Sequence, residues 1–72
     1  MAKFVHIHTG VVINSKGKPF KDSGTGPVAM LIRGEVILSE NKEDIGSIFE
    51  YEKDNLKILS KRDYKSLCKE MA

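Results

Sequence analysis

The sequence predicts an α+β fold, a small curled antiparallel sheet or partly open barrel of roughly four to five strands with one C-terminal amphipathic helix. Three observations predict it. The chain has only 72 residues, enough for one hydrophobic core and therefore for a single small domain over 1–72. Most of its apolar segments are rich in β-branched residues and interrupted by glycine. Only the last segment has apolar residues at helical spacing.

The first strand region covers residues 3–13. Valine and isoleucine dominate it, and Gly10 interrupts it. A glycine within a strand pattern usually marks a bulge or a bend, so the pattern predicts either one bent strand or two short ones. Because side chains alternate along a strand, Phe4, His6 and His8 are expected on one face.

A long polar loop follows over residues 14–27, with three glycines and both prolines of the chain. Connections in compact domains usually have about 4 to 6 residues, so a longer one is either functional or mobile. Within it, the segment 15–18 is suited to close a hairpin on the first strand, with Gly17 supplying a positive φ.

The central strand region covers residues 28–39 and is the most apolar part of the chain. Its run of consecutive apolar residues from Val28 indicates a strand covered on both faces. Arg33 and Gly34 interrupt the run. They form either the tip of a tight hairpin or a bulge in one long curved strand, and the sequence leaves both open.

Asn41 is suited to cap a single helical turn, with Asp44 at the capping-box position and Gly46 ending the turn in the left-handed conformation. Two segments that mix apolar and polar residues then flank the polar residues 53–55. This arrangement predicts a hairpin over residues 47–59.

The C-terminal helix is predicted over residues 61–71. Ser60 is its N-cap, and Asp63 suits the positive end of the helix dipole. Its apolar residues are spaced i, i+3, i+4 and i+7 along one face: Tyr64, Leu67, Cys68 and Met71. A helix of about 11 residues is marginal alone, so this face is expected to dock on the sheet.

The histidines are the first candidates for chemistry. On a strand, His6 and His8 would present two nitrogens to one metal ion. No further ligand lies at a diagnostic spacing, so we interpret them as half-exposed side chains on a sheet face and predict no metal site. Titration of either one would still make a contact pH-sensitive.

The remaining candidates do not point to an enzyme. Cys68 lies on the apolar face of the predicted helix, which is typical of a core cysteine of low reactivity. Glu50 and Glu52 share a strand face and are interpreted as solvating it. The segment 23–26 lacks the glycine spacing of a phosphate loop. We therefore predict a non-enzymatic protein with no catalytic residue and no cofactor.

The segment 16–21 places three lysines around one aromatic residue. Such a cluster can neutralise phosphates while the ring stacks on a base. The alternative is a solvated loop whose aromatic ring folds back on the core. The predicted binding residues are Lys16, Lys18, Phe20 and Lys21, with Arg33 as a companion.

Charge is nearly balanced over the whole chain but segregated along it. Twelve basic against ten acidic residues leave a net charge of +2, which attracts anions without requiring a nucleic acid. Acidic residues concentrate between the central strand region and the last hairpin, and four basic residues line the predicted helix: Lys61, Arg62, Lys65 and Lys69. Segregated charge suits electrostatic docking to a protein, and an unpaired sheet edge can accept a strand.

The function predicted from these features is that of a small non-catalytic binding protein that regulates or inhibits a larger cytoplasmic protein. The alternative is a nucleic-acid-binding barrel that uses the basic loop and the basic helix.

The apolar run at 11–13 is too short for a signal peptide or a membrane span, and a single cysteine favours a reducing compartment, so a cytoplasmic location without a membrane partner is expected. Frequent lysine and isoleucine and no tryptophan are typical of AT-rich genomes, including those of bacterial viruses, whose small proteins include host-takeover and anti-defence factors.

Overall fold

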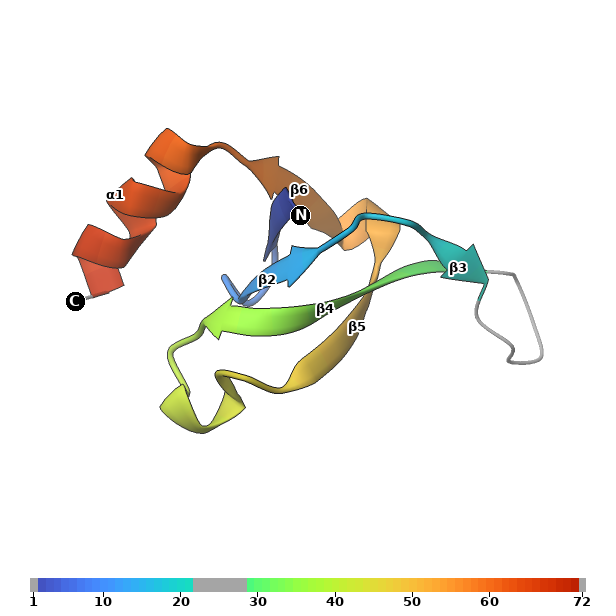
Figure 1. Cartoon of the computed structure of the whole chain (residues 1–72), viewed down its shortest axis with the longest axis horizontal. Helices are drawn as coiled ribbons and strands as arrows, with labels where there is room; N and C mark the ends of the chain where they lie inside the picture. The colour runs from blue at the N-terminus through green and yellow to red at the C-terminus, as the bar shows by residue number, and fades with distance from the viewer. Residues whose placement is uncertain (1, 22–28, 72) are drawn as a thin grey trace.

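A computed structural model describes residues 2–21 and 29–71. Antiparallel strands curl into half of a barrel, and one helix follows at the C-terminal end (Figure 1). The predicted α+β class is confirmed. The elements are β1 (Ala2–His6), β2 (Val12–Ser15), β3 (Phe20–Lys21), β4 (Met30–Leu38), η1 (Lys42–Asp44), β5 (Ile48–Glu52), η2 (Lys53–Asn55), β6 (Leu56–Leu59) and α1 (Lys61–Met71).

β1 and β2 form an antiparallel hairpin that reverses before Val12. Gly10 has a φ of 76°, and its N–H donates to the carbonyl of His6 at 2.8 Å. Of the two alternatives for residues 3–13, two short strands are therefore correct. The hairpin expected at 15–18 is wrong, because the chain has already reversed at Gly10. Gly17 does have a positive φ, of 74°, but it leads the chain from β2 into β3.

β4 is the longest strand and pairs along both edges. β2 and β3 follow each other along one edge, and β5 pairs along the other. Arg33 and Gly34 lie inside this continuous strand, so they are not a hairpin tip. They are not the bulge either: the register shifts where Val12 and Ile13 of β2 pair with Leu38 and Val36, which leaves Ile37 as the extra residue on β4.

The predicted loop over 14–27 is shorter at its start than expected. Residues 14 and 15 belong to β2, and β3 occupies 20 and 21, because both segments find backbone partners on β4. Residues 16–19 connect β2 to β3. The last part of that predicted loop, 22–27 with the segment 23–26, lies outside the described residues, as does Val28 at the start of the predicted central strand region.

The hairpin predicted over 47–59 is wrong, although both of its strands exist. β5 pairs with β4, whereas β6 pairs with β1. The 3-10 turn η2 redirects the chain between them, so that Phe49 and Tyr51 reach the core from the β4 side and Leu56 reaches it from the β1 side. β6 consequently ends the path of paired strands, in the order β3-β4-β2-β1-β6.

The core is built from alternate positions on the strands. Ile13 and Val36 are fully buried inside it, as is Val12 on the neighbouring position of β2. The core cluster consists of Phe4, Val11, Ile13, Ile32 and Val36, with Ala2, Phe49, Tyr51 and Leu56 partly buried against it. So small a core leaves the domain little stability in reserve.

Both predicted helix caps are confirmed. The side chain of Asn41 accepts a hydrogen bond from the N–H of Glu43 at 3.2 Å, and Gly46 has a φ of 95°. Ser60 Oγ accepts from the N–H of Asp63 at 3.1 Å, and α1 begins at the next residue after Ser60. Short polar side chains at these positions satisfy N–H groups that a helix start leaves open.

α1 docks more loosely than its apolar face suggested. Tyr64, Leu67 and Cys68 are only half-buried, and the Lys3 ammonium lies 5.1 Å from the centre of the Tyr64 ring. Figure 1 shows α1 to one side of the sheet, where it follows β6. Among the described residues, no helix has the length and apolar character needed to cross a membrane.

Candidate functional site

The β3 cluster is the set of five predicted binding residues: Lys16, Lys18, Phe20, Lys21 and Arg33. The structure brings two of them together, since the Arg33 guanidinium lies 5.4 Å from the centre of the Phe20 ring. Phe20 is opposite Leu31 in the β3–β4 pairing, and Arg33 follows on the same face two positions later. Such a cation–π contact contributes about 0.5–1 kcal/mol at an exposed site.

Arg33 also contacts a carboxylate on the next strand. Its Nη2 lies 3.2 Å from Oε1 of Glu50, and the two side chains are 61% and 41% exposed. An ion pair this exposed adds little stability. Its effect is geometric, because it holds the guanidinium between the Phe20 ring and the Glu50 carboxylate. Glu50 was expected only to solvate the strand face, and this contact gives it a defined partner.

The three lysines do not all surround the ring. Lys16, Lys18 and Lys21 are exposed, but Lys21 pairs with Met30 and points to the face opposite Phe20. Neighbouring residues in a strand alternate between faces, and the prediction had treated this segment as a loop. The Phe20 ring is half-buried and is not part of the core cluster, so it has not folded into the interior.

The two histidines lie in different environments, although their ring centroids are only 5.6 Å apart. His6 is buried, and its ring stacks on Tyr51 with the centroids 4.1 Å apart, while its Nδ1 lies 2.9 Å from Thr9 Oγ1. His8 lies past the end of β1, is exposed, and contacts Asn55. The two histidines therefore do not share a strand face. In the described part of the chain, no group of three or more His, Cys, Asp or Glu side chains is placed to hold a metal ion.

The buried histidine predicts a pH dependence of stability. Burial, and secondarily the neighbouring His8, lowers the pKa of His6. Between that lowered pKa and the ordinary value near 6.5, the unfolded chain binds more protons than the folded one. The free energy of unfolding is therefore expected to be at its full value above about pH 6.5 and to decrease as the pH falls toward the folded pKa.

Urea unfolding at about pH 8 and about pH 5.5 measures this loss before carboxylates begin to titrate. The variant His8→Asn removes the second cause and should lose less stability over the same interval. Equal stability of the wild type at both pH values would contradict the prediction.

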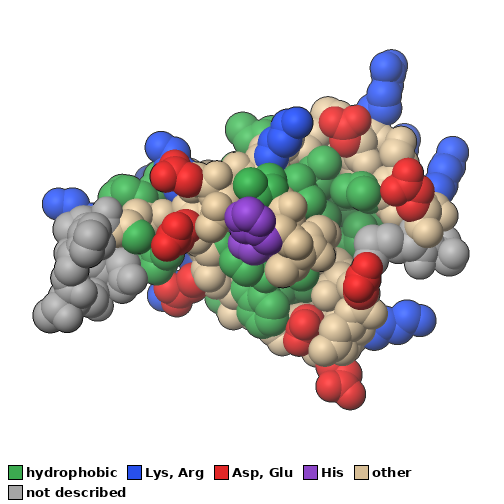
Figure 2. Space-filling view, turned by 180° about the vertical axis from the view of Figure 1, so that it is seen from behind, with side chains coloured by type: hydrophobic (Ala, Val, Ile, Leu, Met, Phe, Trp, Pro, Cys, Tyr) green, Lys and Arg blue, Asp and Glu red, His purple; other side chains and the backbone are tan. Residues whose placement is uncertain are grey.

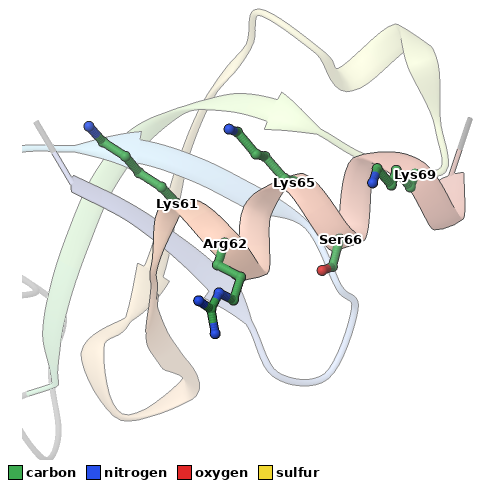
Figure 3. A pocket seen from close by; sticks show the side chains of 5 residues that line it. All are labelled: Lys61, Arg62, Lys65, Ser66 and Lys69. Carbon is green, nitrogen blue, oxygen red and sulfur yellow. The ribbon is translucent and has the colours of Figure 1, made fainter.

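The predicted basic helix surface is present. A hollow on α1 is lined by four cations and one serine, all from this helix: Lys61, Arg62, Lys65, Ser66 and Lys69. Figure 3 shows Lys61 and Lys65 extending on one side of the helix, with Arg62 and Ser66 on the other. Because no second element contributes, the hollow is the space between side chains of one helix and not a cleft.

Cys68 is half-buried on α1. A hydrogen bond with the Cys68 side chain, followed by burial, raises the pKa of Tyr64 one helical turn earlier. The Cys68 thiol therefore lies on the half-buried apolar face of α1, where it contacts Tyr64.

The sequence did not reveal how much apolar surface stays exposed. Figure 2 shows hydrophobic side chains gathered on one face around a histidine. Among the residues whose burial is described, five large apolar side chains are well exposed, and Ile58 is the most exposed of them at 69%: Ile7, Met30, Ile45, Ile48 and Ile58. Ile58 also lines two hollows, one on each side of β6. No local pattern signals this, because it depends on β6 being the last strand of the paired path.

The fold and these surfaces define a small half-barrel with a basic helix, an arginine–aromatic pair and an apolar strand edge. Comparison with protein-family models, curated proteins and solved structures finds no match.

Proposed function

We propose that this chain is a small non-catalytic binding protein that regulates or inhibits a larger cytoplasmic protein by direct contact. The observation that carries the proposal is the Arg33–Phe20 pair, with the guanidinium held between the ring and Glu50. Arginine and aromatic side chains are enriched among residues that dominate binding energy at protein interfaces. A pair that is already in contact before binding has less conformational entropy to lose when a partner covers it.

Two further observations support a protein partner. Charge is segregated, with lysines on α1 and on the segment that leads into β3, and carboxylates on η1 and β5. Exposed isoleucines accompany these charges, and apolar surface of this kind is typical of contact sites. The composition typical of AT-rich genomes makes a host protein of a bacterial virus one candidate target.

Affinity capture from the lysate of the natural host, with cross-linking, tests the proposal. The wild type is expected to capture a stoichiometric protein, and the double variant Phe20→Ala, Arg33→Ala to bind it at least about tenfold more weakly. Lys42→Ala, on the exposed 3-10 turn η1, is the matched control and should bind as the wild type does. No stoichiometric partner, or equal binding by the double variant, would count against the proposal.

The basic face of α1 favours a second candidate function, nucleic-acid binding. Lys61, Lys65 and Lys69 are spaced by one helical turn each, about 6 Å along the axis, and Arg62 lies beside them. A row of cations at this spacing can neutralise several phosphates of one strand.

A salt series tests this second candidate. With four cations engaged, the logarithm of the affinity for duplex DNA should fall against the logarithm of salt concentration with a slope of about 3 to 4. The triple variant Lys61→Glu, Lys65→Glu, Lys69→Glu should abolish binding and the slope with it. If neither DNA nor RNA is retarded in a gel at low salt, this second function is wrong.

A further inference from the structure

β6 has one edge that no strand covers among the described residues. It pairs with β1 alone, in a register that sets Val5 opposite Lys57 and Phe4 opposite Ile58. The N–H of Ile7 donates to the carbonyl of Asn55 at 2.9 Å, which identifies the hydrogen-bonded positions of this ladder. Because these positions alternate along an antiparallel pair, the N–H and C=O of Ile58 point away from β1.

Both sides of this edge are hollowed, and apolar side chains line part of each hollow. The inner hollow, of about 290 Å³, lies over the core and is lined by Phe4, Ile32 and Leu56 together with Ile58. The helix hollow, of about 360 Å³, lies between β6 and α1 and is lined by Val5, Leu59 and Leu67 together with Ile58. A strand added beside Ile58 would direct its successive side chains alternately into these two hollows.

The charges around the inner hollow indicate which segment fits. Within the described part of the chain, Lys53 is the one charged residue that lines it. Gly17 and Pro19 also line it, and both adjoin Lys18, with exposed Lys16 before Gly17. The helix hollow is mixed, with Lys57 opposed by Asp63 and Glu70. The inner side therefore favours apolar residues flanked by carboxylates.

We propose that β6 accepts an extended segment of the larger partner protein as an added antiparallel or parallel strand, with apolar residues at alternating positions and acidic residues at its ends. This rests on the proposed function, because it names the part of a protein partner that binds. Backbone hydrogen bonds to the N–H and C=O of Ile58 bind the added strand, and the two hollows select which side chains it carries. Two other strands border the sheet, β3 and β5, and neither lines these hollows. β3 has only two residues, and β5 carries Glu50 and Glu52 on its outer face.

A fluorescein-labelled peptide of about ten residues, with valine and isoleucine alternating with serine in its centre and glutamates at both ends, is the probe. Anisotropy titration of the full chain is expected to give binding that Ile58→Lys weakens by about tenfold or more, because a charge opposes strand pairing at an edge. Ile48→Lys makes the same change at the other exposed isoleucine of a border strand and should stay within about twofold of the wild type. The same peptide with lysine ends should bind about tenfold more weakly.

Ile58→Pro gives a second test, since it removes the outward N–H and proline is tolerated at such edge positions. It is expected to abolish peptide binding with the circular dichroism spectrum unchanged. If this variant unfolds, the proposal is tested by Ile58→Lys alone. Equal binding by Ile58→Lys, equal binding of the lysine-ended peptide, or binding of a single-stranded oligonucleotide in place of the peptide would overturn the proposal.

The same variants separate this inference from the proposed function. If Ile58→Lys captures the partner as well as the wild type does, strand addition is wrong and the proposed function stands. If the wild type captures no protein from lysate, the proposed function fails, and peptide binding then decides whether the β6 edge is a binding site.

Discussion

Replacing Ile13 by alanine is expected to lower the free energy of unfolding by about 3–4 kcal/mol. Ile13 is fully buried on β2, between Phe4 on β1 and Val36 on β4, which are its partners in the two ladders. Deleting three methyl or methylene groups there removes their transfer free energy and leaves a cavity that strands on both sides keep open. A domain of this length has a total stability of roughly 4–10 kcal/mol, so the variant should lose between about a third and nearly all of its stability.

Urea unfolding monitored by circular dichroism measures this effect. Ile58→Ala removes the same groups from a side chain that is 69% exposed and should change stability by no more than about 0.5 kcal/mol. Similar losses from the two substitutions would mean that Ile58 is part of the folded core, which would contradict both the burial assignment and the edge proposal.

Elements whose ends depend on neighbouring residues could be predicted from the sequence. Ser60 and Asn41 accept hydrogen bonds from N–H groups two or three residues later, so the start of α1 and the turn at η1 are visible in short stretches of sequence. The strands themselves could be located from their β-branched residues in the same way.

Strand pairing could not be predicted, because it depends on burial summed over the whole chain. Gly10 and Gly17 both have a positive φ, and either could reverse the first strand. The chain reverses at Gly10, which places Ile13 and Val11 in the core. The polar turn at η2 likewise resembles a hairpin turn locally, and only the separate positions of Tyr51 and Leu56 on the core show that it is a corner.

The candidate site was likewise predictable only where it depends on residues close in the sequence. Sequence proximity identified the lysines and Phe20, but the contact of Phe20 with Arg33 depends on β3 pairing with β4. The β6 edge was foreseen only as a general property of small sheets. That β6 has a free edge follows from its pairing with β1, a contact between strands near the two ends of the chain.

The substitution Gly34→Ala is expected to lower the free energy of unfolding by about 2–3 kcal/mol. An added Cβ would lie 2.8 Å from the carbonyl oxygen of Asn14 and 3.0 Å from Cδ1 of Ile13. The oxygen is backbone of the neighbouring strand, so relief requires β2 and β4 to separate where their ladder pairs Asn14 with Glu35.

Urea unfolding again provides the measurement, with Glu35→Ala as the control in the next position of β4. Glu35 is exposed, so its replacement should cost no more than about 0.5 kcal/mol. Gly34→Val should destabilise the fold more than Gly34→Ala, since its added methyl groups would clash with the same atoms of β2. Without such a clash, valine would be favoured over alanine in a strand. A valine variant as stable as the wild type would show that β4 and β2 do not approach this closely. The pairing of β4, which brings Arg33 close to Phe20, would then need a different register, because Gly34 is the position at which β4 passes from β3 to a close approach with β2.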